Sequence, residues 1–192
     1  MIKVIDNIIS KEEQEQIKSL LLDKPFPWYY LNDVSKRDNT HQKRPGLSHF
    51  FILEKNKINS DNFKDVELII DNTSKKLKIK VKDILQVRSF LQLPLNKNFL
   101  GKGIDTPHID SLEPHIVFLY YVCDSDGDTI IYDYKTEKEG DVPFFEDVKE
   151  KKRITPKQGR VVVFDGLYWH TAEQPKKDVR CILNFNISSN GT

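Results

Sequence analysis

The chain has few cysteines and no long apolar stretch. Cys123 and Cys181 are its only cysteines, too few for a disulfide framework or a thiolate zinc site. No segment approaches the roughly 20 apolar residues of a membrane span, and residues 1–14 lack the sustained apolar core of a secretory signal. We therefore expect a reduced, soluble protein of the cytoplasm with no membrane partner.

The chain also lacks a net charge of either sign. Its 30 basic and 29 acidic residues leave a formal charge of +1, which argues against binding to nucleic acid or a membrane surface without excluding nucleic acid. Only six of the basic residues are arginine, so each arginine is a candidate for a specific role. The densest basic cluster, in the polar segment 32–46, comprises Lys36, Arg37, Lys43 and Arg44. We interpret that cluster as a solvated loop.

The chain has 192 residues, of which 10% are aromatic. This length fits one domain that is large enough to bury a hydrophobic core. A short strand is expected at 2–5 and another at 47–53. Ser10 followed by Glu13 is a capping-box pattern that predicts a helix through about Leu22. Apolar residues at helical spacing predict a second helix over 61–76.

From Ile84 onward the pattern changes to short β-rich runs separated by turn residues. The expected strands are 84–93, 106–110, 115–122, 128–132, 160–165, 168–173 and 179–187. The charged segment 133–153 is expected to be an insertion outside the core. The spacing predicts a mainly β (α+β) fold, a sandwich or jelly roll, in which residues 1–83 form a helical support packed on one face and residues 84–192 form the core.

The histidines suggest one metal site. His108 and Asp110 are two residues apart, the spacing that puts two strand side chains on one face, whereas His41, His49 and His115 have no such partner. His170 follows 60 residues after Asp110. Two histidines and one carboxylate form the facial triad that leaves coordination positions open on iron.

Arg180 lies ten residues beyond His170 and opens the last expected strand. Alternation puts Arg180, Ile182, Asn184 and Asn186 on one face of that strand and only apolar residues on the other. A cation with two amides suits a wet barrel interior better than an exposed surface, which is the alternative for this face. Arg180 is therefore expected to pair with the carboxylate of an anionic cosubstrate.

Over residues 88–187 the chain resembles the Fe(II)/2-oxoglutarate-dependent dioxygenases of the prolyl 4-hydroxylase-like branch, most closely small phage-encoded members. The matching segments are Thr106-Pro107-His108-Ile109-Asp110, Leu119-Tyr120-Tyr121-Val122, Gly127-Asp128-Thr129, 156–164, Trp169-His170-Thr171 and Arg180. The resemblance implies a double-stranded β-helix, or jelly roll, and a cytoplasmic location, the host cytoplasm for a phage protein. It further implies hydroxylation of a C–H bond with release of succinate and CO2.

The resemblance also implies a set of site residues. His108, Asp110 and His170 would bind Fe(II), and Arg180 would bind the C5 carboxylate of 2-oxoglutarate. Tyr121, or its neighbour Tyr120, and Gln92 would contact the same cosubstrate. Apart from the resemblance, Asn184 and Asn186 on the inner face of the last strand are expected to contact a polar substrate, and Trp169 beside His170 is expected to contact the substrate and shield the reacting centre. O2 would be the second cosubstrate and ascorbate a supporting reductant.

The substrate and the oligomeric state stay open. The segment Gln92-Leu93-Pro94-Leu95 replaces the Tyr-x-x-Gly of the family, so a prolyl residue, another amino-acid-type substrate or a small molecule are all retained. Three alternatives also remain: an oxidative demethylase of modified nucleobases, a zinc hydrolase using the same triad, and a non-catalytic jelly-roll binding module. The hydrolase has no use for Arg180.

Overall fold

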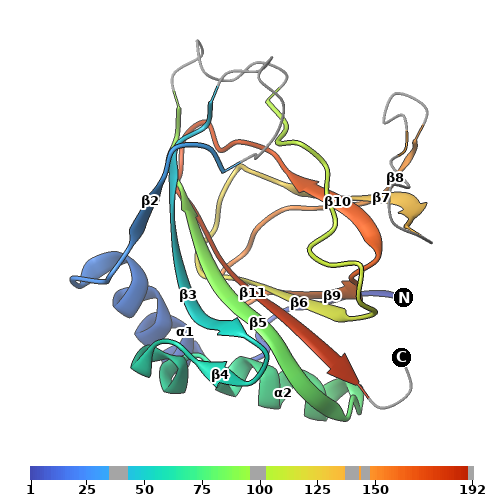
Figure 1. Cartoon of the computed structure of the whole chain (residues 1–192). Coiled ribbons are helices and arrows are strands. Elements are labelled where there is room, and N and C mark those ends of the chain that lie inside the picture. Colours follow the sequence, from blue (N-terminus) through green and yellow to red (C-terminus); the bar gives the residue numbers. More distant parts are fainter. Residues whose placement is uncertain (35–42, 96–102, 137–142, 144–147, 190–192) are drawn as a thin grey trace.

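Two antiparallel β-sheets face each other in the computed structural model of the chain, which describes residues 1–34, 43–95, 103–136, 143 and 148–189 (Figure 1). The strands are β1 (Ile2–Ile5), β2 (Tyr29–Leu31), β3 (Gly46–Glu54), β4 (Lys57–Ile58), β5 (Val81–Gln92), β6 (Ile116–Tyr121), β7 (Thr129–Lys135), β8 (Glu150–Ile154), β9 (Val161–Asp165), β10 (Tyr168–Ala172) and β11 (Arg180–Ser189). The larger sheet has eight strands, in the order β1-β9-β6-β11-β5-β3-β2 with β4 attached to β3. The smaller has the order β10-β7-β8.

The helices cover the outer face of the larger sheet (Figure 1). They are α1 (Lys11–Lys18), continued by a π-helical turn, η1 (Ser19–Asp23), and α2 (Leu68–Leu77), preceded by a 3-10 turn, η2 (Asp61–Asp65). The predicted capping box is confirmed: the Ser10 hydroxyl accepts from the Glu13 backbone N–H at 3.2 Å, and the Glu13 carboxylate accepts from the Ser10 backbone N–H at 2.7 Å.

Alternation along β11 separates the core from the interior between the sheets. Cys181, Leu183, Phe185 and Ile187 pack with the helices in the main hydrophobic cluster, whereas Ile182 belongs to a second cluster between the sheets. The predicted assignment of the two faces of this strand is therefore confirmed. The polar residues of the inner face therefore lie on a strand whose other face is packed into the main hydrophobic cluster.

Three local predictions are wrong. Residues 106–110 do not form a strand: Pro107 supplies no backbone donor, and a single bridge joins His108 to His170. The helix expected over 61–76 is divided into η2 and α2. Residues 150–153 of the expected insertion belong to β8, which was not predicted, although their side chains are exposed as expected for a segment outside the core. Residues 137–142 and 144–147 of that insertion lie outside the described residues.

The predicted fold class is confirmed as a mainly β jelly roll with helices on one face. The stretch 1–83 is not purely helical, because it also supplies β1 to β4, and its expected boundary falls inside β5. In the part of the chain that the structure describes, no helix is long and apolar enough to cross a membrane.

Candidate metal and cosubstrate site

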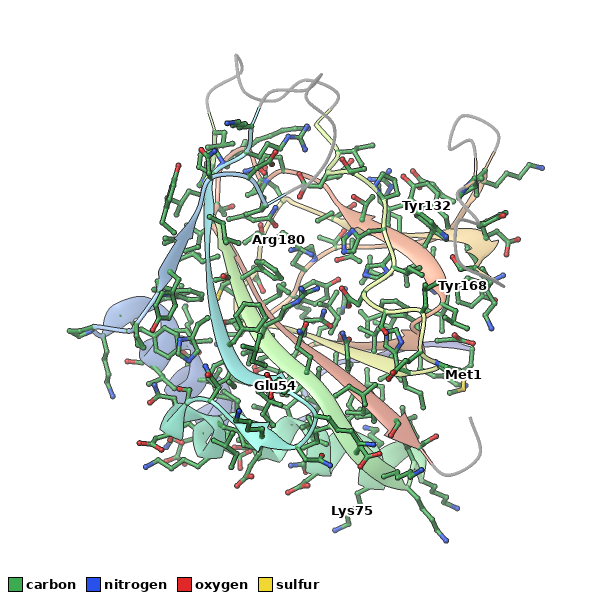
Figure 2. All side chains as sticks on the ribbon, viewed as in Figure 1. Met1, Glu54, Lys75, Tyr132, Tyr168 and Arg180 are labelled. Carbon is green, nitrogen blue, oxygen red and sulfur yellow. The ribbon has the colours of Figure 1, made fainter. Side chains whose placement is uncertain are left out.

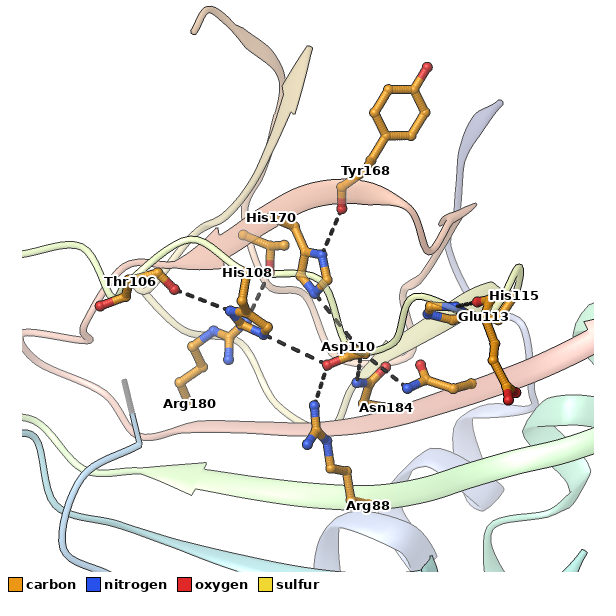
Figure 3. Close-up of polar contacts among 12 residues, drawn as sticks. Arg88, Thr106, His108, Asp110, Glu113, His115, Tyr168, His170, Arg180 and Asn184 are labelled. Carbon is orange, nitrogen blue, oxygen red and sulfur yellow. Dashed lines mark hydrogen bonds and ion pairs between the residues drawn. The ribbon is translucent and has the colours of Figure 1, made fainter. Parts of the chain in front are cut away.

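The three predicted metal ligands meet between the two sheets. His170 lies on β10 and is bridged to His108, while Asp110 lies two residues further along the connection to β6. One ligand atom from each residue lies within 4.8 Å of the others. His108 Nε2 is 3.7 Å from Asp110 Oδ1, and His170 Nε2 is 4.0 Å from Asp110 Oδ2 (Figure 3).

Backbone carbonyls select the nitrogen that each histidine presents. His108 Nδ1 lies 3.1 Å from the Thr106 carbonyl oxygen, and His170 Nδ1 lies 3.1 Å from the Tyr168 carbonyl oxygen. A neutral imidazole that donates from Nδ1 keeps a lone pair on Nε2. Both Nε2 atoms face the Asp110 carboxylate. This donor set therefore fits a divalent first-row metal such as Fe(II).

The charges of the triad suit metal binding at neutral pH. Burial lowers the pKa of His108 to about 4, helped by the nearby His170, and burial also lowers the pKa of His170. Burial would raise the pKa of Asp110, but Arg88 and the two histidines outweigh it and hold that pKa well below its usual range. Two neutral imidazoles and one carboxylate result.

Arg180 is buried at the start of β11 and lines the same cavity (Figure 2). Its Nε donates to the Gly127 carbonyl at 3.0 Å, its Nη1 to Gln92 Oε1 at 2.9 Å and its Nη2 to Thr129 Oγ1 at 2.8 Å. A guanidinium has five N–H donors. Among the described residues, these contacts leave two donors for an anion.

A chain of buried contacts extends from Arg180 to the N-terminal third of the sequence. Gln92 Nε2 donates to Asp105 Oδ2 at 2.8 Å, and Arg44 Nη1 pairs with Asp105 Oδ1 at 2.6 Å. Gln92 thus donates on one side and accepts from Arg180 on the other, which fixes its amide orientation. The interpretation of Arg44 as part of a solvated loop is wrong: Arg44 is 5% exposed. Lys36 and Arg37 lie outside the described residues.

Tyr121 and Tyr120 point to opposite faces of β6. The Tyr121 hydroxyl donates to Thr129 Oγ1 at 2.7 Å, the oxygen that also accepts from Arg180. Burial raises the pKa of Tyr121 to about 12, so it stays protonated. Tyr120 lies in the cluster beneath the helices. Tyr121 is therefore on the Arg180 side, with Thr129 between it and the cavity.

Trp169 needs a correction. Its side chain packs with Ile130 and Tyr132, and its Nε1 donates to Thr136 Oγ1 at 2.7 Å. Strand alternation explains this: His170 points inward, so Trp169 points to the outer side of β10. Phe164 packs edge-on against His170 instead, with ring centroids 5.1 Å apart. Trp169 does not line the cavity and leaves the candidate site.

A cavity of about 310 Å³ connects the triad with Arg180. Gln92, Asn184 and Thr129 contribute polar atoms to its wall. The apolar lining residues include Leu31, Phe50, Phe90, Ile109, Leu119 and Ile182. Leu31, the last residue of β2, thus brings the N-terminal part of the chain to the cavity wall.

Sequence reasoning missed Arg88, Asp105 and Thr129. Arg88 forms an ion pair with the triad carboxylate of Asp110. The sequence did contain a pattern that could have pointed to Arg88, because Arg88 and Gln92 are four residues apart and share a face of one strand. Asp105 had no comparable signal, since its partner Arg44 is 61 residues away.

Comparisons with known proteins give a fold but no closer relationship. No protein-family model and no curated protein matches the chain significantly. A 2OG-Fe(II) oxygenase-family oxidoreductase from Burkholderia pseudomallei is 11% identical, with a TM-score of 0.66, 97% of this chain and 85% of that chain covered. A prolyl hydroxylase from Trichoplax adhaerens, solved with a hypoxia inducible factor peptide, is 12% identical (TM-score 0.61, coverage 97% and 82%). A Pseudomonas putida prolyl-4-hydroxylase is 11% identical (TM-score 0.58, coverage 98% and 92%). The chain shares the jelly-roll fold of these oxygenases.

Proposed function

We propose that this protein is an Fe(II)- and 2-oxoglutarate-dependent dioxygenase that hydroxylates a C–H bond of a prolyl residue or another amino-acid-type substrate. In the net reaction, 2-oxoglutarate and O2 give succinate and CO2 while the substrate gains one oxygen atom. One observation carries the proposal: buried Arg180 lines the same cavity as the triad of His108, Asp110 and His170. A zinc hydrolase would need the triad and not this cation.

The triad residues would hold the metal through the two Nε2 atoms and the Asp110 carboxylate. When bound, Fe(II) would supply the redox chemistry that activates O2. The chain contributes neutral imidazoles and a deprotonated carboxylate at neutral pH, as the lowered pKa values of all three groups indicate. With three protein ligands, coordination positions would remain for the cosubstrates.

Arg180 would anchor the C5 carboxylate of 2-oxoglutarate with its two remaining N–H donors. Charge-assisted hydrogen bonds of this kind are strong and directional. Gln92 and Thr129 would keep the guanidinium in place, because both accept from it. Tyr121 would support Thr129 from behind. Ascorbate would be a supporting reductant and not a structural component.

The substrate part of the cavity favours a small group. A volume of about 310 Å³ is at the lower end of the range of about 300–1,000 Å³ for ligand pockets, and it must also accommodate 2-oxoglutarate. The walls near the triad include Phe50, Phe90 and Ile109, which suit an aliphatic ring or chain. The peptide bound to the Trichoplax neighbour makes a peptidyl substrate a reasonable first choice.

Turnover of 2-oxoglutarate tests the proposal. Succinate should be measured anaerobically and in air, with Fe(II) and ascorbate, against proline-containing peptides, free amino acids and alkylated oligonucleotides. We expect O2-dependent succinate release that a peptide or amino acid stimulates. Stimulation by oligonucleotides alone would instead identify a demethylase, and metal-dependent hydrolysis without succinate would identify a hydrolase.

Matched variants connect that activity to the site. Asp110→Ala should abolish succinate release, whereas Asp133→Asn, at an exposed carboxylate paired with Lys151, should leave it unchanged. Arg180→Ala should chiefly raise the concentration of 2-oxoglutarate required. Equal activity of all three variants would contradict the assignment of the site.

A further inference from the structure

The carboxylate of Asp110 is held by three side chains besides its two histidine neighbours. Oδ2 accepts from Asn184 Nδ2 at 2.8 Å and from Asn186 Nδ2 at 3.2 Å. Oδ1 is paired with Arg88 (Figure 3). The Asp110 side chain is only 2% exposed, so these contacts and not water determine how the carboxylate lies.

The backbone alone does not fix this carboxylate. Asp110 lies in an irregular segment between the bridge at His108 and the start of β6. Asn184 and Asn186, in contrast, lie on β11, which is paired on both sides by β5 and β6. A rigid central strand therefore positions a ligand that belongs to a loop.

Burial of the two amides destabilises the folded protein. Asn184 is 5% exposed and Asn186 is 4% exposed, and the Oδ1 atom of each is buried without a hydrogen-bond partner among the described residues. An unpaired buried acceptor destabilises a fold. Apolar side chains of similar size would avoid that cost but would leave Asp110 Oδ2 without its amide donors, so the two asparagines are best explained by what they do to Asp110.

The arrangement also distinguishes the two carboxylate oxygens. A carboxylate oxygen has about two lone-pair sites. Both oxygens lie near a histidine, Oδ1 at 3.7 Å from His108 Nε2 and Oδ2 at 4.0 Å from His170 Nε2. They differ in their other contacts among the described residues, because two amides donate to Oδ2 whereas Oδ1 has one partner, Arg88. Oδ1 is therefore the oxygen with a site left for a metal.

We propose that Asn184 and Asn186 are positioning residues that occupy Asp110 Oδ2 and reserve Oδ1 for the metal. This inference rests on the metal site of the proposed function. It assigns Asn184 a role different from the substrate contact suggested by its sequence position. The pair acts through Asp110 and is not itself expected to touch the metal.

The test compares metal affinity with metal-free stability in Asn184→Leu and Asn186→Leu. Mn(II) is titrated into the 192-residue chain by isothermal calorimetry, and the thermal unfolding midpoint is measured with chelator present. We expect Mn(II) affinity to fall about 10–100-fold, the range for loss of a group that orients a metal ligand. The metal-free midpoint should fall only slightly, because the loss of one hydrogen bond to a buried carboxylate is partly offset by the removal of an unpaired buried acceptor.

Two further variants keep the test decisive. Thr73→Val removes another buried, unpartnered oxygen, in α2 away from the site, and should leave Mn(II) affinity unchanged. Asn184→Ala removes the amide donor without adding a charge or apolar bulk, and should reduce affinity in the same range as the leucine variant. This smaller change decides the question if the leucine variants do not fold.

The outcomes separate the two proposals. Wild-type protein that does not bind Mn(II) would contradict the proposed function itself. Wild-type binding that persists unchanged in Asn184→Ala and in both leucine variants would overturn the positioning role. Leucine variants with a clearly lower metal-free midpoint but normal affinity would show that the amides are ordinary structural contacts, which also overturns it.

Discussion

Buried polar side chains form a continuous chain of contacts between Arg180 and Arg44. Gln92 donates to Asp105 and accepts from Arg180, and Asp105 also pairs with Arg44. A buried carboxylate is costly unless it is paired and hydrogen-bonded, and here both oxygens of Asp105 have partners. Each side chain therefore limits the orientation of the next, so the position of Arg180 depends in part on Arg44, which does not line the cavity.

Gln92→Leu tests this dependence. The substitution removes an acceptor from Arg180 and a donor from Asp105, and a hydrogen bond to a charged group contributes about 1.5–3 kcal/mol. We expect the KM for 2-oxoglutarate to rise about 10–100-fold, with Mn(II) affinity unchanged. Gln174→Leu, at a buried glutamine that donates to the Leu93 carbonyl, is the control. Equal KM values in the two variants would contradict the role of Gln92.

His49 offers a pH test outside the site. Its ring packs against Phe26 and Phe51, and burial lowers its pKa below the usual value near 6.5. Above that pH neither state is protonated. As the pH falls below it, the unfolded chain gains a proton that the folded protein does not, so stability falls by up to about 1.4 kcal/mol per pH unit.

The substitution His49→Phe should remove that contribution. His108 and His170 shift in the same direction, so the variant keeps part of the pH dependence. Urea unfolding of the metal-free protein from about pH 7 to about pH 5 measures the slope of stability against pH. A slope equal to that of the wild type would show that His49 titrates alike in both states.

At the scale of the element, the predictions that succeeded depended only on residues close together in the sequence. The capping box of α1 and the alternation of β11 follow directly from residue spacing. β8 was missed because four of its five residues are exposed, so no apolar alternation marks it. The supposed strand at 106–110 failed because pairing is limited to His108, and partner positions are not readable from spacing.

Ser10→Ala tests the start of α1. Removing an N-cap side chain costs typically about 1 kcal/mol, and here the reciprocal bond from Glu13 loses its geometry as well. We expect the free energy of unfolding to fall by about that amount, with no change in Mn(II) affinity. Glu13→Gln keeps an acceptor at N3 and should cost less. If Ser10→Ala is as stable as the wild type, the capping box contributes nothing to the free energy of unfolding.

At the scale of the molecule, the jelly roll brings distant segments into one cavity. The strand spacing predicted the fold class, and the candidate metal ligands and Arg180 were predicted from residue types, their spacing and the family resemblance. The contacts from Arg44 to Asp105 and from Arg88 to Asp110 were not, because they depend on how β3, β5 and the connection before β6 pack in three dimensions. Contacts between residues far apart in the sequence thus determine how the site residues are oriented.

Ligand binding should stabilise the whole fold. A metal that binds only the folded protein adds about 2.7 kcal/mol at a free concentration about 100 times its Kd. We therefore expect Mn(II) to raise the thermal unfolding midpoint and a chelator to reverse the change. Asp110→Ala should show no such shift. A midpoint that is insensitive to Mn(II) in the wild type would indicate that no metal binds in the folded state.

The most direct test of the central claim is an anaerobic titration with Fe(II) followed by 2-oxoglutarate, monitored by visible absorption. If His108, Asp110 and His170 hold the metal beside Arg180, the wild-type protein should develop a metal-to-ligand charge-transfer band that requires both additions. Asp110→Ala should show no band, and Arg180→Ala should need more 2-oxoglutarate to reach it. A wild-type spectrum without this band after both additions would contradict the account.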